Sequence, residues 1–128
     1  MQKLLTIVIP CKNEEAYIKD TLFNLKQQGI GQTKIYLADA RSTDQTRVVA
    51  ENYAHELNLN LTIIPGGLPA VGRNNGAKLA KTPYVLFLDA DITFTNPTAI
   101  EQALDTISNR EFDMVSSNPV YHGPIDRM

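Results

Sequence analysis

Short apolar runs rich in β-branched residues alternate along the chain with segments whose apolar residues recur every three or four positions. Runs of the first kind predict strands, and segments of the second kind predict amphipathic helices. The predicted strands are 4–9, 34–38, 59–64, 84–88 and 113–117, with a helix in each interval between them. This alternation predicts an α/β fold, a mostly parallel sheet joined by right-handed crossovers, with helices on both faces.

Residues typical of helix ends lie near the predicted boundaries. Asn13, followed by two glutamates, is expected to cap the first helix, and Gly29 and Gly31 are expected to end it. The segment 42–45, Ser-Thr-Asp-Gln, has the spacing of a capping box for the second helix. The pair 96–97, Asn-Pro, is expected to start the fourth.

The sequence predicts one domain that spans residues 1–128, since it contains no internal repeat and no low-complexity segment. The fourth predicted strand, 84–88, is apolar on both faces, which is typical of a central strand in a parallel sheet. No closing element is evident after residue 121, so the domain is expected to be truncated.

Composition narrows the class of partner and the location. The chain has 12 Lys and Arg and 14 Asp and Glu, a net charge of −2, and scattered basic residues, which argues against nucleic acid. Cys11 is the single cysteine, so no internal disulfide forms, and we interpret it as a packing residue. No apolar stretch approaches the ~20 residues of a membrane span, and no signal-peptide core is present. A cytoplasmic location is therefore expected.

Acidic residues follow two of the predicted strands. In open α/β sheets, ligands bind beyond the carboxyl ends of strands, where Asp39, Asp89 and Asp91 would lie. If the fourth strand continues that far, Asp89 and Asp91 point to the same side and repel each other unless a cation intervenes. Mg²⁺ and Mn²⁺ take oxygen ligands and share them with phosphates. The pair predicts a metal–diphosphate site, and the alternative is a solvated acidic turn.

Two further side chains have chemistry suited to a nucleotide. Arg73, between Gly72 and Gly76, could donate two hydrogen bonds to a phosphate through its planar guanidinium. Asp39 could accept a hydrogen bond from a nucleobase or ribose. Each has a simpler alternative, a surface arginine on a helix for Arg73 and a turn residue at a helix entry for Asp39.

Four ordered motifs resemble those of the family 2 glycosyltransferases. They are Val-Ile-Pro-Cys-Lys-Asn-Glu-Glu at 8–15, Asp-Ala-Arg-Ser-Thr-Asp at 39–44, Gly-Arg-Asn at 72–74 and Leu-Phe-Leu-Asp-Ala-Asp at 86–91. Each motif is weak alone, but four in the right order are specific together. The resemblance extends from about residue 5 to about residue 121.

The resemblance implies a GT-A fold and an inverting transfer from a nucleoside-diphosphate sugar to an acceptor hydroxyl, with Mn²⁺ or Mg²⁺. It implies that Pro10, Lys12, Asn13 and Glu14 line the nucleotide pocket, that Asp39 contacts the base, typically uracil, and that Arg73 approaches the nucleotide. It also implies that Asp89 and Ala90 bind the nucleotide sugar and that Asp89 and Asp91 form the metal motif, with Asp91 expected as the direct ligand.

The sequence departs from the family pattern at two places. Ala40 and Arg41 stand where the family often has aspartate and glycine, which should change the local turn more than the activity. The family's catalytic base is a carboxylate well downstream of the metal motif, and is expected beyond Met128 with the acceptor-binding half. We therefore expect donor binding with little transfer from this chain alone. The acceptor, saccharide or lipid-linked, is not specified, and an exposed edge would favour a homo-oligomer.

Two rival functions remain open from sequence. A sugar-nucleotide pyrophosphorylase uses a related sheet, but it would need a glycine-rich basic loop where residues 10–15 are acidic and glycine-free. A nucleotide-binding or assembly module that lost catalysis is the non-enzymatic alternative. It predicts that replacing Asp91 changes no ligand interaction.

Overall fold

The computed structural model describes residues 1–110 and 120–121. Its elements are β1 (Leu5–Cys11), α1 (Ile18–Gln27), β2 (Lys34–Asp39), α2 (Thr46–Glu56), β3 (Asn60–Pro65), α3 (Pro69–Leu79), β4 (Tyr84–Phe87), β5 (Ile92–Thr93), α4 (Ala99–Arg110) and β6 (Val120–Tyr121). From β1 to β4 they follow the predicted alternation, and the short strands β5 and β6 were not predicted. The predicted strand at 113–117 lies outside the described residues.

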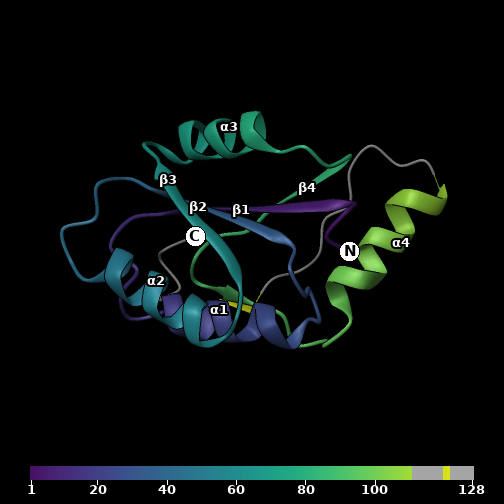
Figure 1. Ribbon diagram of the computed structural model, residues 1–128, viewed down its shortest axis with the longest axis horizontal. Coiled ribbons are helices and arrows are strands. Elements are labelled where there is room, and N and C mark those ends of the chain that lie inside the picture. Colours follow the sequence, from purple (N-terminus) through teal and green to yellow (C-terminus); the bar gives the residue numbers. More distant parts are fainter. Residues whose placement is uncertain (111–119, 122–128) are drawn as a thin grey trace.

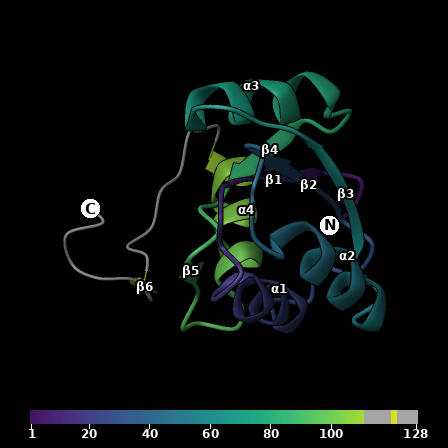
Figure 2. The same ribbon diagram turned by 90° about the vertical axis from the view of Figure 1, so that its left-hand side faces the viewer.

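The main sheet has the order β3-β2-β1-β4, and every neighbouring pair in it is parallel. Helix α3 covers one face, and α1 and α2 cover the other (Figures 1 and 2). The short strands β5 and β6 form a separate antiparallel pair. The predicted α/β fold, with a parallel sheet and helices on both faces, is confirmed.

Strand β1 supplies side chains to both faces because successive residues of a strand point to opposite sides. Ile7 and Ile9 are fully buried in the core, together with Ile18 and Leu22 of α1. On the opposite face α3 approaches closely, because a Cβ on Gly76 would lie 2.4 Å from a methyl carbon of Val8. Glycine at this position therefore sets the distance between α3 and the sheet.

Two helix starts differ from the prediction. Helix α1 begins at Ile18, and Asn13 has a φ of 53° and uses its side-chain oxygen to accept the amide of Thr43 at 2.8 Å. Helix α2 begins at Thr46, while Ser42 donates its hydroxyl to Asp39 at 2.5 Å. Both predicted caps are wrong, because Asn13 bonds the loop after β2, and Ser42 bonds Asp39 and the amide of Asn13, instead of the first turn of a helix. Helix α1 ends at Gln27, just before Gly29 and Gly31, which both have positive φ, and this agrees with the prediction.

Strand β4 lies at the edge of the sheet in the part of the chain that the structure describes, where it pairs with β1. Leu86 packs on the core, but Phe87 is 46% exposed. The central position expected from its apolar sequence is therefore not met within residues 1–110 and 120–121. Over this same range, no helix combines the length and apolar character needed to cross a membrane.

Candidate functional site

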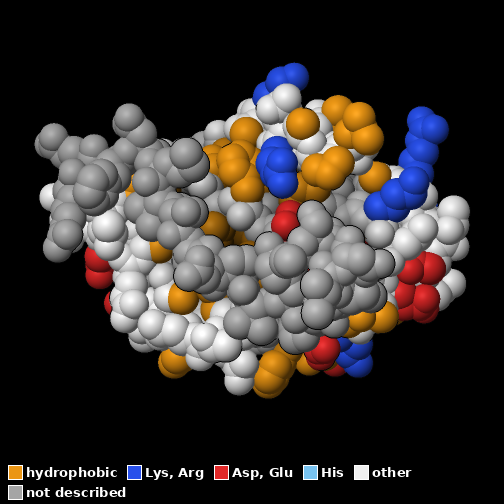
Figure 3. Space-filling view, turned by 180° about the vertical axis from the view of Figure 1, so that it is seen from behind, with side chains coloured by type: hydrophobic (Ala, Val, Ile, Leu, Met, Phe, Trp, Pro, Cys, Tyr) orange, Lys and Arg blue, Asp and Glu red, His pale blue; other side chains and the backbone are white. Residues whose placement is uncertain are grey.

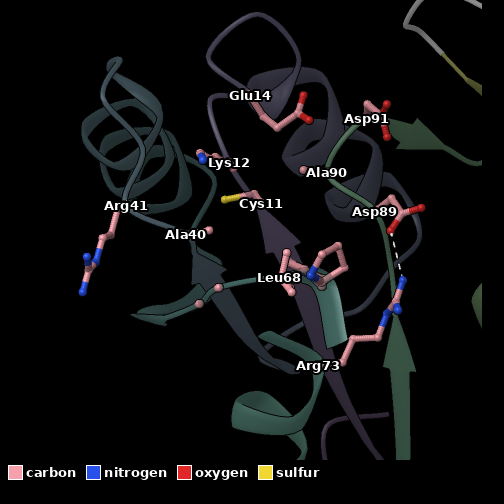
Figure 4. Close-up of a pocket in the computed structure, with 14 residues that line it drawn as sticks. Cys11, Lys12, Glu14, Ala40, Arg41, Leu68, Arg73, Asp89, Ala90 and Asp91 are labelled. Atoms are coloured by element: carbon pink, nitrogen blue, oxygen red, sulfur yellow. Dashed lines mark ion pairs between the residues drawn. The ribbon is translucent and has the colours of Figure 1, made fainter. Parts of the chain in front are cut away.

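A cavity of about 820 Å³ opens at the carboxyl ends of the four parallel strands (Figure 4). Its walls come from the segments that follow each strand, as the position of ligand sites in open α/β sheets predicts. The lining residues are Pro10, Cys11, Lys12, Glu14, Ala40, Arg41, Gly66, Gly67, Leu68, Pro69, Arg73, Asp89, Ala90 and Asp91. The chain thus contributes to the cavity from four separate segments.

Most residues predicted from sequence for the site line this cavity. They are Pro10, Lys12, Glu14, Arg73, Asp89, Ala90 and Asp91. Asn13 and Asp39 do not line it and have structural contacts close behind its wall. Three cationic residues, Lys12, Arg41 and Arg73, and three acidic residues, Glu14, Asp89 and Asp91, are among the lining, so charge of both signs surrounds the cavity.

The two aspartates of the Asp-Ala-Asp motif have different surroundings. Strand β4 ends at Phe87, so the condition under which both would point to the same side is not met. Asp91 is 6% exposed, whereas the side chain of Asp89 is 52% exposed and turns toward Arg73 (Figure 4). The amide of Ile92 donates to the carbonyl of Asp89 at 3.3 Å, so residues 89–92 form a β-turn with Ala90 and Asp91 at its centre.

The acidic pair fits a hard divalent cation that also binds phosphate. Among residues 1–110 and 120–121, no group of three or more His, Cys, Asp or Glu side chains could hold a metal ion. Mg²⁺ is held in many sites by one or two carboxylates, with phosphate oxygens and water as its remaining ligands. Asp91 and Asp89, both lining the cavity, are a donor set of this kind.

Arg73 reaches the motif from the opposite wall. Its Nη2 atom lies 3.8 Å from Oδ1 of Asp89, which links α3 to the segment after β4. Both side chains are near half exposure, so water screens the pair and a ligand has access to both groups. A guanidinium in this position is suited to a phosphate oxygen.

Asp39 lies under the cavity wall, with its side chain 3% exposed. Its carboxylate accepts the amide of Ser42 at 3.1 Å and the Ser42 hydroxyl at 2.5 Å, and it lies 3.6 Å from Nε of Arg47. Ser42 in turn accepts the amide of Asn13 at 2.9 Å. These bonds tie the loop after β1 to the loop after β2, so Asp39 and Asn13 both hold the wall in place.

Cys11 lines the cavity but has little nucleophilic character. Burial raises the pKa of its thiol well above the ordinary value, and the nearby negative charge of Asp39 raises it further. Its Sγ atom donates to Asp39 Oδ1 at 3.6 Å. Because the thiolate is the reactive form, this environment agrees with the interpretation of Cys11 as a packing residue.

The structure adds an apolar wall that the sequence did not single out. Leu68 is 78% exposed although it lines the cavity, and Pro69 follows it at the start of α3. The turn before Leu68 packs tightly on β2, because a Cβ on Gly66 would lie 2.6 Å from the carbonyl oxygen of Ala38. The amide of Gly66 also donates to the carbonyl oxygen of Asp39 at 2.9 Å. Hydrophobic side chains also gather over α3 in the space-filling view (Figure 3). In the sequence, the feature that could have indicated this wall is a Pro-Gly-Gly turn followed by Leu-Pro at 65–69.

Comparison with known proteins gives consistent matches. The family model described as Glycosyl transferase family 2 matches residues 6–127. The chain is 30% identical over 120 residues to the processive diacylglycerol beta-glycosyltransferase of Mycoplasma genitalium, covering 89% of this chain and 35% of that protein. It is 31% identical over 114 residues to the poly(ribitol-phosphate) beta-N-acetylglucosaminyltransferase TarS of Staphylococcus aureus, covering 86% and 20%. The chain thus spans about a third or less of these relatives.

Solved structures share the fold. The crystal structure of S. aureus TarS 1–349 in complex with UDP matches with a TM-score of 0.71 and 29% identity, over 84% of this chain and 33% of that chain. The mannosyltransferase PcManGT from Pyrobaculum calidifontis, solved with GDP-Man and Mn²⁺, matches with a TM-score of 0.75 and 22% identity, over the same shares of the two chains. The expected GT-A type of α/β fold is confirmed.

Proposed function

Because the chain belongs to glycosyltransferase family 2, we propose that it binds the donor of an inverting glycosyl transfer from a nucleoside-diphosphate sugar to an acceptor hydroxyl. The observation that carries this proposal is the buried carboxylate of Asp91 in the same cavity as Asp89 and Arg73. Groups of opposite charge around one cavity suit a diphosphate with its cation. A sugar alone would require neither.

The acidic motif and Arg73 form the diphosphate end of the proposed site. Asp91 and Asp89 would hold Mn²⁺ or Mg²⁺, which supplies charge neutralisation for the leaving diphosphate when it is bound. Arg73 would then turn from Asp89 to a phosphate oxygen with a charge-assisted hydrogen bond. Lys12, also in the lining, adds a second positive charge.

The apolar wall forms the nucleoside end. Leu68 and Pro69 line the cavity together with two further apolar residues, Pro10 and Ala40. A flat base could be buried between these surfaces, and Leu68, which is exposed in the free chain, would gain the most from this burial. The loop 39–44 is hydrogen-bonded to Asn13 and to Gly66, so it limits how far the cavity wall can move.

We favour a uridine nucleotide among the donors. TarS of S. aureus, 29% identical in the matched region, is solved in complex with UDP. Asp39 of this chain does not line the cavity and its side chain is 3% exposed, so it would contact the base only after its surroundings moved. In our proposal Asp39 therefore supports the cavity wall, and a direct contact to uracil would require a rearrangement.

Calorimetric titration of the chain with UDP, with and without Mn²⁺, tests the proposal. We expect Mn²⁺ to strengthen UDP binding, and Asp91→Asn to remove most of that gain. Asp105→Asn, which changes an exposed aspartate of α4, is the matched control and should behave as the wild type. A chain that binds neither UDP nor GDP under any of these conditions would contradict the proposal.

A further inference from the structure

Three polar side chains of α1 and its C-cap lie on one side of the helix and face the segment that follows β4. They are Thr21, Asn24 and Gln28, whose spacing of three and four residues places them on one helical face. Thr21 and Gln28 are almost fully buried. We call these three residues the α1 polar ladder. Within the described part of the chain, its side chains form hydrogen bonds with backbone groups.

Thr21 bonds the acidic motif directly. Its hydroxyl donates to the carbonyl oxygen of Ala90 at 2.5 Å. Ala90 and Asp91 are the central residues of the turn 89–92, so this carbonyl belongs to the central peptide of the turn. The common turn types differ by a flip of this peptide. The Thr21 hydroxyl, by donating to the Ala90 carbonyl, stabilises one of the two orientations of this peptide.

The peptide that Thr21 holds also contains the backbone nitrogen of Asp91. Since the peptide unit is planar, fixing the Ala90 carbonyl fixes the direction in which the chain enters Asp91. The flipped peptide would require a positive φ at Asp91, which is unfavourable for a residue with a side chain. The Thr21 hydrogen bond adds to this preference, and together they restrict where the Asp91 carboxylate can point.

The other two members fix the chain beyond the turn. Asn24 donates to the carbonyl of Phe94 at 2.9 Å and accepts its amide at 2.7 Å. Gln28 donates to Asn96 O at 2.7 Å and accepts the amide of Ile100 at 3.1 Å. This segment has little regular structure of its own apart from the two-residue strand β5 beside α1 (Figure 2).

We propose that the α1 polar ladder positions Asp91 for a divalent cation, with Thr21 as its principal positioning residue. The proposal rests on the proposed function, because it assigns the supporting contacts of the same metal–diphosphate site. None of the three side chains lines the cavity. They act through the backbone of the motif, as supporting residues around metal ligands commonly do.

Titration of UDP into the Thr21→Val chain, with and without Mn²⁺, tests this role. Valine keeps the shape of threonine and removes the donor. We expect metal-free UDP affinity within about twofold of the wild type, and a loss of roughly tenfold in the gain that Mn²⁺ provides, as for other supporting residues of metal sites. Thr21→Ser, which keeps the hydroxyl, should restore the gain. A purely structural role would lower the melting temperature without changing the ratio of the two affinities.

Gln28→Met gives a second test at the other end of the ladder if Thr21→Val does not fold, as judged by circular dichroism. We expect a smaller loss of the Mn²⁺ gain. Gln27→Met, an exposed neighbour, should keep the full gain. A folded Thr21→Val chain with the full wild-type gain overturns the ladder's role and leaves the donor site standing. A wild-type chain that binds UDP without any gain from Mn²⁺ also overturns it, and a chain that binds neither UDP nor GDP overturns both proposals.

Discussion

The guanidinium of Arg73 lies 3.8 Å from the carboxylate of Asp89, so α3 and the segment after β4 meet across the cavity. Their side chains are 43% and 52% exposed. An ion pair this exposed contributes about 0–1 kcal/mol to stability. Its two members are therefore available for ligand binding at little cost to the fold, which leads to a first prediction.

Arg73→Gln should weaken UDP binding by roughly ten- to a hundredfold, because a hydrogen bond to a charged group is worth about 1.5–3 kcal/mol. The melting temperature should change little. Calorimetry and thermal unfolding measure the two effects separately. Lys78→Gln removes an exposed cation from the same helix and should leave UDP binding unchanged. Equal UDP affinity for the Arg73→Gln chain and the wild type would exclude Arg73 from the site.

Leu68→Asp should weaken UDP binding while leaving pyrophosphate binding nearly unchanged. The apolar wall is proposed to bury the base, and pyrophosphate has none. Loss of a buried leucine contact corresponds to about 1.5–3 kcal/mol at full burial, so a loss of roughly tenfold is expected. Competition of the two ligands against a fluorescent nucleotide gives both affinities.

The control for this variant is Val48→Asp, which changes an aliphatic side chain of α2 that is 53% exposed and outside the cavity. It should bind both ligands as the wild type does. If Leu68→Asp weakens UDP and pyrophosphate equally, the effect is electrostatic and the apolar wall does not hold the base.

Gly76→Ala should destabilise the fold by about 1–3 kcal/mol, the usual cost of overpacking a core. The added Cβ would lie 2.4 Å from Val8, so one of the two elements must move. Urea denaturation gives the free energy of unfolding. The Gly76→Ala/Val8→Ala double variant should be destabilised by less than the sum of the two single variants. The difference should be at least about 0.5 kcal/mol, since the two residues are in contact. Strictly additive costs would show that α3 does not pack against Val8.

Cys11 should react with iodoacetamide far more slowly in the native chain than in concentrated urea at mildly alkaline pH. Burial and the charge of Asp39 raise its pKa above the ordinary 9.0, so the folded chain keeps the proton that the unfolded chain loses. Its contribution to stability is therefore complete below pH 9.0 and is lost as pH rises above that value. Mass spectrometry reports this residue alone, because the chain has one cysteine. Equal labelling rates would contradict the raised pKa.

The order and type of the four parallel strands and the four helices could be predicted from the sequence, because short apolar runs indicate burial in the sheet, whereas the two-residue strands β5 and β6 were not predicted. Strands β2 and β3 lie within one residue of their predicted bounds. Helix starts could not be predicted as well. Asn13 and Ser42 are good capping residues, but their side chains bond partners about 30 positions away. The residue types near a helix start cannot show whether a side chain caps the helix or bonds a loop that is distant in sequence.

The site was predictable where its chemistry is carried by charge at a strand end. Lys12, Glu14 and Asp91 line the cavity as expected, because the carboxyl ends of parallel strands meet at one edge. Leu68 was missed, since an apolar residue after a turn has no distinctive pattern. Thr21 was missed for a different reason, because its partner Ala90 lies 69 residues further along the chain.

The pairing of β1 with β4, which sets Leu5 beside Tyr84, has a consequence for the order of events during folding. As the chain leaves the ribosome, β1, β2 and β3 emerge early and can form three adjacent strands of the sheet. The acidic motif arrives only with β4, and contacts this distant in sequence form late because loop closure must come first. A nascent chain can therefore have three strands of the sheet and part of its core before the acidic motif joins the other cavity-lining segments. We expect the proposed nucleotide site to be complete only once β4 has paired with β1.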